Sequence, residues 1–381
     1  MPQSEWQDAV ITRGRDTRRC VLTPAVVCSR RRPPRAPVDQ ASAETVRRAP
    51  RPIGSTLPPE EPTMTASSTR RTTAAHSRPA AVGAIAVAGA LLLTGCGDQT
   101  ESSGSGSDTR TSEAPLADKL PQSIRDAGVI KVGSDIAYAP VEFKDSSGKV
   151  VGIDPDLAAA MGKQLGVTFE FKNGTFDTLI TGLRSKRYDI AMSAMTDTKD
   201  RQEGIDSETG KKVGQGVDFV DYFTAGVSIY TKKGDDQGIK TWKDLCGKKV
   251  VLQRGTVSED LAKAEAKKCP KGKKLSIEAF DNDQQAQTRL RAGGADAGSS
   301  DFPVAAYAVK TSGGGKDFQL VGEQVEAAPY GIAVAKDNTK LRDALKAALD
   351  AVIANGEYKK ILDKWGVAEG AVTEATINGG K

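Results

Sequence analysis

Short β-like runs alternate with helical stretches from residue 128 onward, and this alternation constrains the fold more than any other feature of the chain. The expected strands span 129–133, 168–171, 188–194, 227–230, 249–252, 276–280, 295–299 and 331–335. The expected helices span 155–165, 177–185, 258–268, 283–291, 305–310, 339–354 and 358–365. Strands that alternate with helices form βαβ units and a mostly parallel sheet. Because a second set begins near residue 227, we predict an α/β protein with two lobes.

The helix expected at 155–165 has local signals at both ends. Asp154 is a candidate N-cap and Pro155 suits the first turn. Gly166 follows the last turn, where glycine commonly ends a helix. We therefore expect Asp154 to cap this helix at its start and Gly166 to follow its end.

The net charge of +5 is not spread over the chain. Residues 1–95 hold 14 Arg and 7 acidic residues, whereas the remainder holds 40 basic and 42 acidic residues. The arginines of the first part alternate with proline and small polar residues and not with aromatic residues that could stack on bases. We therefore expect no nucleic-acid partner.

An uncharged run at 80–93 resembles a secretory signal more than a membrane span. Its fourteen residues follow Arg70, Arg71 and Arg78, whereas a spanning helix needs about 20 apolar residues. The residues Leu93-Thr94-Gly95-Cys96 then resemble a bacterial lipobox, in which Cys96 becomes the acylated first residue. We expect a signal peptide at 64–95 and a flexible lipid tether at 96–115. Residues 1–63 are then a disordered extension or a mis-assigned start, and the alternative for 80–93 is a short buried helix.

The only histidine, His76, lies in the predicted signal. Ser-His-Asp and Cys-His catalysis and histidine metal sites are therefore excluded from the remainder. Once Cys96 is assigned to lipid, Cys246 and Cys269 are the only cysteines after it. Because an exported protein meets an oxidising environment, we predict a disulfide, which would add about 3 kcal/mol of stability by closing a loop of about 24 residues. Two free buried thiols are the alternative.

Polar clusters follow the predicted strands, where ligands of open α/β sheets bind. They are SDIAYAPVEF (134–143), SAMTDTKDR (193–201), QRGTVS (253–258) and SDFP (300–303), together with YD (188–189), DF (218–219) and YGIA (330–333). In this order and spacing, over about 250 residues, they resemble the polar amino-acid-binding proteins of ABC importers, solute-binding family 3.

This resemblance implies a two-lobed periplasmic-binding-protein-like fold, in which two α/β lobes are joined by a two-strand hinge. Lobe one would comprise 116–224 and 329–366, lobe two 225–328, and 367–381 would form a C-terminal tail. It also implies a binding protein that is no enzyme and needs no cofactor or metal.

The resemblance also implies roles for individual residues, because an α-amino acid is a zwitterion. Arg201 would pair with the ligand α-carboxylate, aided by the Thr196 hydroxyl and by backbone N–H groups near Ala194, Thr196 and Val257. Asp301 would take the α-ammonium.

Tyr138 and Phe176 would sandwich the apolar stem of the ligand side chain. Structural alternatives stay open for three of the predicted residues. Arg201 lies in a charged run and could be a solvated surface residue, Phe176 could be core packing, and Asp301 could be only an N-cap.

Asp135 is the residue that bears most on the ligand class. In the family this position often faces the far end of the ligand side chain, where a buried carboxylate favours a cation or an amide and repels a carboxylate. Arg254 is a candidate neutraliser of Asp135. Gln253 and Ser300 replace the Lys and His typical of glutamine binders, so we favour a basic side chain over glutamine.

The resulting hypothesis is an exported, monomeric protein that is lipid-anchored to the outer face of the cell membrane. It would close its lobes on an amino acid and dock on a permease whose ATPase is a separate chain. A cyclohexadienyl dehydratase-like enzyme on the same fold and an extracellular amino-acid sensor module are the rival functions. Residues 207–216 are longer than usual for the family and are expected to form a surface loop.

Overall fold

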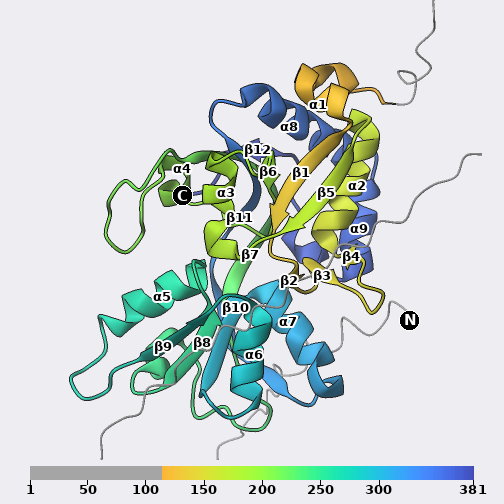
Figure 1. Cartoon of the computed structure of the whole chain (residues 1–381). Coiled ribbons are helices and arrows are strands. Elements are labelled where there is room, and N and C mark those ends of the chain that lie inside the picture. The colour runs from red at the N-terminus through yellow and green to blue at the C-terminus, as the bar shows by residue number, and fades with distance from the viewer. Residues whose placement is uncertain (1–113) are drawn as a thin grey trace, which may run out of the picture. The chain divides into compact units, whose positions relative to one another are not determined.

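The computed structural model describes residues 114–381 (Figure 1). The predicted extension 1–63, the signal 64–95, the lipidation site Cys96 and the tether as far as residue 113 lie outside the described residues. Within the described part, no helix has the length and hydrophobicity needed to span a membrane.

The elements follow the predicted alternation closely. The strands are β1 (Val129–Ser134), β2 (Ala137–Tyr138), β3 (Glu142–Lys144), β4 (Val150–Val151), β5 (Thr168–Asn173), β6 (Ile190–Ala191), β7 (Val217–Lys232), β8 (Lys249–Gln253), β9 (Ser276–Phe280), β10 (Ala297–Asp301), β11 (Phe318–Ala335) and β12 (Thr376–Ile377). The α-helices are α1 (Gln122–Ala127), α2 (Ile153–Leu165), α3 (Leu179–Arg184), α4 (Lys199–Glu203), α5 (Val257–Ala266), α6 (Asp283–Arg291), α7 (Phe302–Thr311), α8 (Thr339–Ala354) and α9 (Glu357–Trp365). Short 3-10 turns are η2 (Ala117–Lys119), η3 (Phe176–Thr178), η4 (Trp242–Leu245), η5 (Ser312–Gly314) and η6 (Ala368–Gly370).

The main sheet has the strand order β5-β1-β6-β11-β7-β10-β8-β9, with β12 beside β7. As predicted, β1 is parallel to β5 and β6, and β8 is parallel to β9 and β10. The prediction of a mostly parallel sheet is wrong for the centre, where β7 and β11 pair antiparallel. The physical reason is that the chain enters lobe two along β7 and returns along β11.

The fold is two-lobed, as predicted, and β7 and β11 form the two-strand connection (Figure 1). Thr224 pairs with Pro329 and Ala225 pairs with Ala328, so the predicted lobe boundaries lie opposite each other on the two strands. The register of the pair shifts on both sides of this point, which loosens the ladder locally. The boundaries themselves stay a prediction.

Helices cover both faces of the sheet in each lobe. In lobe one, α2, α8 and α9 pack around Leu157 and Leu345, while Phe176 and Leu179 pack with Phe219 on the other face. In lobe two, Leu252 and Ala262 belong to the core under α5, and the core under α6 and α7 is a separate cluster. The strand ends that carry polar residues are therefore fixed by two apolar clusters in each lobe.

Helix α2 differs from its prediction at the N-terminus. It begins at Ile153, and Asp154 is a fully buried residue of the first turn and not the N-cap. The Asp154 carboxylate accepts a hydrogen bond from Tyr222 Oη at 2.7 Å. The end is as predicted, because Gly166 caps the helix with a left-handed φ of 69°.

The predicted disulfide is confirmed. Cys246 and Cys269 are bonded, with their Cα atoms 5.4 Å apart. Cys246 ends η4 and Cys269 follows α5, so the bond ties these two elements of lobe two together.

Two segments outside the predicted elements make contacts of their own. The expected surface loop 207–216 is mostly exposed and contacts α5, where Ser207 Oγ donates to Asp260 at 2.7 Å and Lys263 pairs with Glu208 at 3.0 Å. The predicted tail 367–381 forms η6 and β12, and β12 pairs with β7.

Candidate ligand-binding site

Residues that follow strands of both lobes meet between the lobes. Gln253, at the end of β8, donates a hydrogen bond from Nε2 to the carboxylate of Asp135, which follows β1. The backbone N–H of Asp301, at the end of β10, donates to Tyr138 Oη at 3.2 Å. The lobes are thus in direct contact at the site predicted from the strand ends.

Arg201 lies in the middle of α4, whose N-cap Thr198 accepts a hydrogen bond from the Arg201 backbone N–H. Its Nη1 donates to the carbonyl of Thr196 at 2.7 Å, and its Nη2 donates to the carbonyl of Gly255 in lobe two at 2.9 Å. Its Cζ lies 5.3 Å from the ring centroid of Phe176. Burial lowers the pKa of the guanidinium, which nevertheless stays charged. Within residues 114–381 this charge touches no carboxylate, so it can receive an anion.

Asp301 is buried at the N-cap position of α7, but its side chain makes no capping hydrogen bond. The structure therefore does not use this carboxylate as a helix cap. Burial raises its pKa to about 6, against the opposing effects of Tyr330, Tyr138 and Arg201. Tyr330 Oη is fully buried and has no hydrogen-bond partner of good geometry in the described part of the chain. The group can therefore gain a partner when a polar ligand is present.

Asp135 and a second carboxylate form the other end of the site. Burial raises the pKa of Asp135 to about 7; the hydrogen bond from Gln253 opposes this shift, and the nearby charges of Asp283 and Asp177 add to it. Asp283 opens α6 and is 1% exposed. It accepts hydrogen bonds from Ser300 Oγ at 2.8 Å and from Gln287 Nε2 at 2.5 Å. Burial raises its pKa to about 6.

Sequence reasoning missed Asp283, although a signal was available. The rule that places sites after strand ends was applied to four strands but not to the strand 276–280. Asp283 follows that strand by three residues. Its first-turn position in α6 brings it near β2, which carries Tyr138.

The suggested neutraliser of Asp135 lies elsewhere. Arg254 pairs with Asp281 at 3.2 Å, donates to the carbonyl of Ala279 and is about half exposed. The hypothesis that Arg254 neutralises Asp135 is therefore wrong, because its side chain turns to the surface of lobe two. The partner of Asp135 is the neutral amide of Gln253.

The other predicted residues already make contacts within the described part of the chain. Thr196 pairs with Tyr330 in an isolated β-bridge, and Val257 is the first residue of α5, after the N-cap Thr256. The N–H of Ala194 donates to Asp154 at 3.4 Å, so this group is already engaged. Phe176 is buried in the core, which was the structural alternative for it, and its ring also faces Arg201; its contact with a ligand stem stays a prediction. Ser300 contacts Asp283.

Two acids are buried in lobe one behind Asp135. The backbone N–H of Asp135 donates to Ser193 Oγ at 3.0 Å, and this hydroxyl donates to Glu142 at 2.5 Å. Burial and the neighbouring Asp154 raise the pKa of Glu142 well above its usual range. Burial also raises the pKa of Asp154 to about 7, against the hydrogen bond from Tyr222. Ser193 therefore connects the turn that presents Asp135 to this acid pair.

The sequence is similar to known proteins over the region that contains these residues. The model for bacterial extracellular solute-binding proteins, family 3, matches residues 130–368. The arginine-binding protein ArgT of Corynebacterium glutamicum is 32% identical over 262 residues, which are 68% of this chain and 81% of that protein. The histidine-binding periplasmic protein of Escherichia coli K12 is 30% identical and covers 65% of this chain and 88% of its own.

Solved structures show the same relationship. An ancestral arginine-binding protein bound to arginine is 39% identical with a TM-score of 0.56, covering 62% of this chain and 98% of its own. The ancestral amino acid-binding protein AncCDT-1, a precursor of cyclohexadienyl dehydratase, is 35% identical with a TM-score of 0.55, covering 64% and 97%. The family model spans well over half of the chain, and its range includes every residue of the site. The chain therefore belongs to the bacterial extracellular solute-binding proteins of family 3.

Proposed function

We propose that the protein binds a basic L-amino acid between its lobes, with L-arginine as the first candidate, and delivers it to the permease of an ABC importer. The observation that carries this proposal is the charge arrangement of the site. Arg201, whose guanidinium touches no carboxylate among residues 114–381, lies at one end, and the buried carboxylates of Asp301, Asp283 and Asp135 form the rest of the site. Relatives named for arginine binding support the choice of arginine.

The end of the site at Arg201 suits the part that all α-amino acids share. A guanidinium can bind a carboxylate with two parallel N–H donors, and Arg201 would turn these donors from carbonyl oxygens to the ligand. The α-ammonium would then pair with Asp301, beside the hydroxyls of Tyr138 and Tyr330. Phe176 and Tyr138 would contact the aliphatic stem.

The opposite end distinguishes among side chains. Asp135 already accepts a hydrogen bond from an N–H donor of Gln253, which supports its assignment to a donor group of the ligand. A guanidinium or ammonium satisfies both Asp135 and Asp283, whereas the carboxylate of glutamate would be repelled by several kcal/mol. A neutral amide of glutamine offers donors but no charge. We therefore rank basic amino acids above glutamine.

Lobe closure would couple capture to delivery. A ligand that touches Arg201 in lobe one and Asp301 in lobe two meets both only when the lobes are shut, so it favours the closed form. Bending at the register shifts of β7 and β11 would open and close the cleft. The closed form would dock on a membrane permease whose ATPase is a separate chain.

The remaining parts of the proposal concern location. The signal at 64–95 would direct export, and acylation of Cys96 would hold the protein at the outer face of the membrane through the tether 96–115. The protein would act as a monomer, without a cofactor.

The dehydratase alternative is supported by the likeness to AncCDT-1, which is described as a precursor of cyclohexadienyl dehydratase. Prephenate, however, carries two carboxylates. With one at Arg201, the other would meet Asp135 or Asp283, both buried and acidic. Incubation of the protein with prephenate or arogenate tests this alternative directly, because release of an aromatic product would end the transport proposal.

A thermal-shift screen of the twenty amino acids, followed by calorimetric titration, tests the proposed function. We expect the melting temperature to rise most with arginine, lysine or ornithine. Arg201→Ala should weaken arginine binding by about 100-fold or more, whereas the control Arg254→Ala removes a nearby surface arginine and should change it less than about twofold. Stabilisation by glutamate alone, or equal losses in the two variants, would refute the assigned charge arrangement.

A further inference from the structure

The last residues of the chain, 376–381, bind the segment that carries Arg201. We propose that this C-terminal strap is a positioning element of the binding site, which holds the guanidinium of Arg201 where the ligand carboxylate arrives. The inference rests on the proposed function of Arg201, but it concerns residues that do not touch the ligand.

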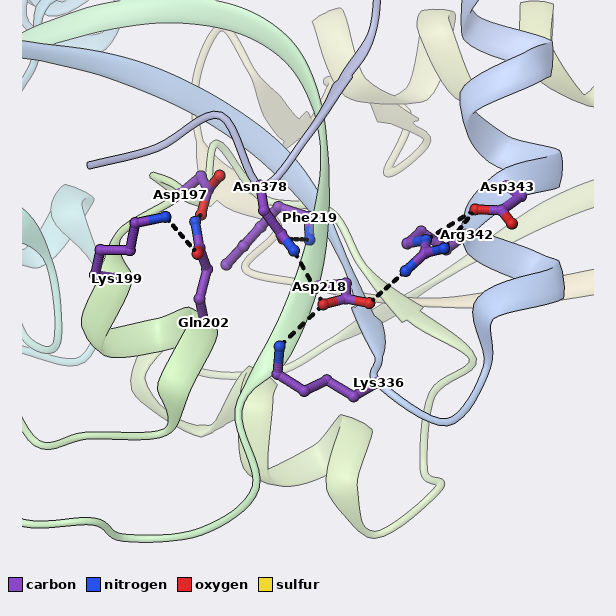
Figure 2. Close-up of polar contacts among 9 residues, drawn as sticks. All are labelled: Asp197, Lys199, Gln202, Asp218, Phe219, Lys336, Arg342, Asp343 and Asn378. Atoms are coloured by element: carbon purple, nitrogen blue, oxygen red, sulfur yellow. Dashed lines mark hydrogen bonds and ion pairs between the residues drawn. The ribbon is translucent and has the colours of Figure 1, made fainter.

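The strap is anchored on the rigid centre of the sheet (Figure 2). Asn378 donates from its backbone N–H to the carbonyl of Phe219 at 3.2 Å, and its Oδ1 accepts from the Phe219 N–H at 2.8 Å. Its Nδ2 donates to Asp218 at 3.1 Å. Asp218 also pairs with Lys336 at 3.0 Å and Arg342 at 2.8 Å, and these partners lower its pKa although burial opposes the shift. The base of the strap is therefore fixed in a charged network on β7.

From this base the strap reaches the residues just before and within α4. Gly379 N–H donates to Asp221 at 2.9 Å, and Gly380 N–H donates to Asp197 Oδ2 at 2.8 Å. The Lys199 N–H donates to the Lys381 carbonyl at 3.3 Å. The backbone of the strap thus binds both the carboxylate that precedes α4 and the first residue of that helix.

Helix α4 depends on such contacts because it contains only five residues. A helix this short is unstable in isolation, and its position is set by what it touches. Asp197 Oδ1 accepts from Gln202 Nε2 at 2.7 Å, and Lys199 Nζ donates to the other end of the same amide at 2.9 Å (Figure 2). Asp197 therefore links the strap on one side to α4 on the other, next to Arg201.

Loss of the strap would remove both donors of Asp221, Thr376 and Gly379, and one of the two donors of Asp197, whose other oxygen keeps Gln202. Asp197 and Asp221 are almost fully buried, and burial together with the charge of Asp197 raises the pKa of Asp221 to about 6. Buried acceptors without partners are costly, so the turn would move to expose them to water. Since Arg201 is four residues from Asp197, this movement would displace the guanidinium.

Two variants test the proposal. Deletion of 376–381 removes the strap, and Gly380→Ala displaces it, because a Cβ there would lie 2.0 Å from the carbonyl oxygen of Asp197. The control Glu374→Ala changes an exposed residue just before the strap. Calorimetric titration should compare L-arginine with L-argininamide, which lacks the carboxylate charge but keeps the ammonium and the side chain.

We expect Gly380→Ala to weaken L-arginine binding at least about tenfold, to change L-argininamide binding less than about twofold, and to speed amide hydrogen exchange over 197–203 relative to the control. For Gly380→Ala, equal losses for both ligands, unchanged arginine binding, or unchanged exchange would overturn the proposal. These outcomes decide the question even where the deletion variant does not fold. If the wild-type protein binds L-arginine and L-argininamide with equal affinity, the assigned role of Arg201 is wrong, and the inference that depends on it is wrong as well. The exchange result then shows separately whether the strap holds α4.

Discussion

The affinity for arginine should fall as the pH is lowered from about 8 to about 5, because the carboxylates that receive the cation must lose their protons first. In the closed site, burial raises the pKa of Asp135 to about 7 and that of Asp301 to about 6. The bound cation favours the ionised forms and therefore lowers both values. Binding thus releases protons near neutral pH, and protons compete with the ligand at acid pH.

The size of the effect follows from the ionised fractions. A group with a pKa of about 7 is almost fully ionised at pH 8 and about 1% ionised at pH 5, so Asp135 alone sets a ceiling of about 100-fold. Asp301 adds about tenfold in the same way. An open cleft rehydrates both groups and lowers their pKa values, so we expect a measured loss of about ten- to 100-fold.

The assay is calorimetric titration of arginine at four pH values, repeated in buffers of different ionisation enthalpy to count released protons. Citrulline, which has the shape of arginine without its side-chain charge, should show a smaller pH dependence. Asp135→Asn should lower the arginine affinity at pH 8 and remove most of the slope, whereas Asp281→Asn, at an exposed acid of lobe two, should remove none. Affinities that agree within about twofold from pH 8 to pH 5 would refute the assignment of Asp135 to the cation.

Three further results are expected. Asp283→Asn should weaken arginine binding about tenfold in calorimetry and change glutamine binding less, because asparagine keeps the shape of the side chain but loses its charge; equal effects on both ligands would remove Asp283 from the side-chain end. Replacing Cys246 and Cys269 with serine should lower the free energy of unfolding in urea by about 3 kcal/mol, and an unchanged midpoint would show that the loop is already ordered in the unfolded chain. Cys96→Ala should release the protein from membranes in cell fractionation, and continued retention would contradict the lipid anchor.

The sequence allowed the flanking strands and most helices to be predicted because each carries its own local period. The first part of β7, residues 217–226, could not be predicted in this way, because Asp218 and Asp221 interrupt its apolar pattern. These acids are tolerated in a buried strand because distant residues satisfy them: Asp218 is held by Lys336 and Arg342, and Asp221 by the strap. Partners more than a hundred residues away leave no local signal.

In the candidate site, too, only residues with a local sequence signal could be predicted. Arg201, Asp301 and Asp135 follow strand ends or known motifs, and the structure places them around the junction of the lobes. Asp154 was interpreted as a helix cap because its local pattern matches one, whereas its partner Tyr222 is 68 residues away. The contacts of residues 376–381 could not be predicted for a similar reason, because a short polar segment resembles an exposed tail until the strand beside it is known.

The course of β7 and β11 has a consequence for the order in which the protein folds. β6 pairs with β11 in the sheet of lobe one, so that sheet is incomplete until the chain beyond residue 330 has been synthesised. The elements from β8 to α7 follow one another without interruption, and they can find their partners while the end of the chain is still on the ribosome or in the export channel. The lobe that begins the described chain is therefore the last to be completed, and a nascent chain would acquire half of its binding site well before the other half.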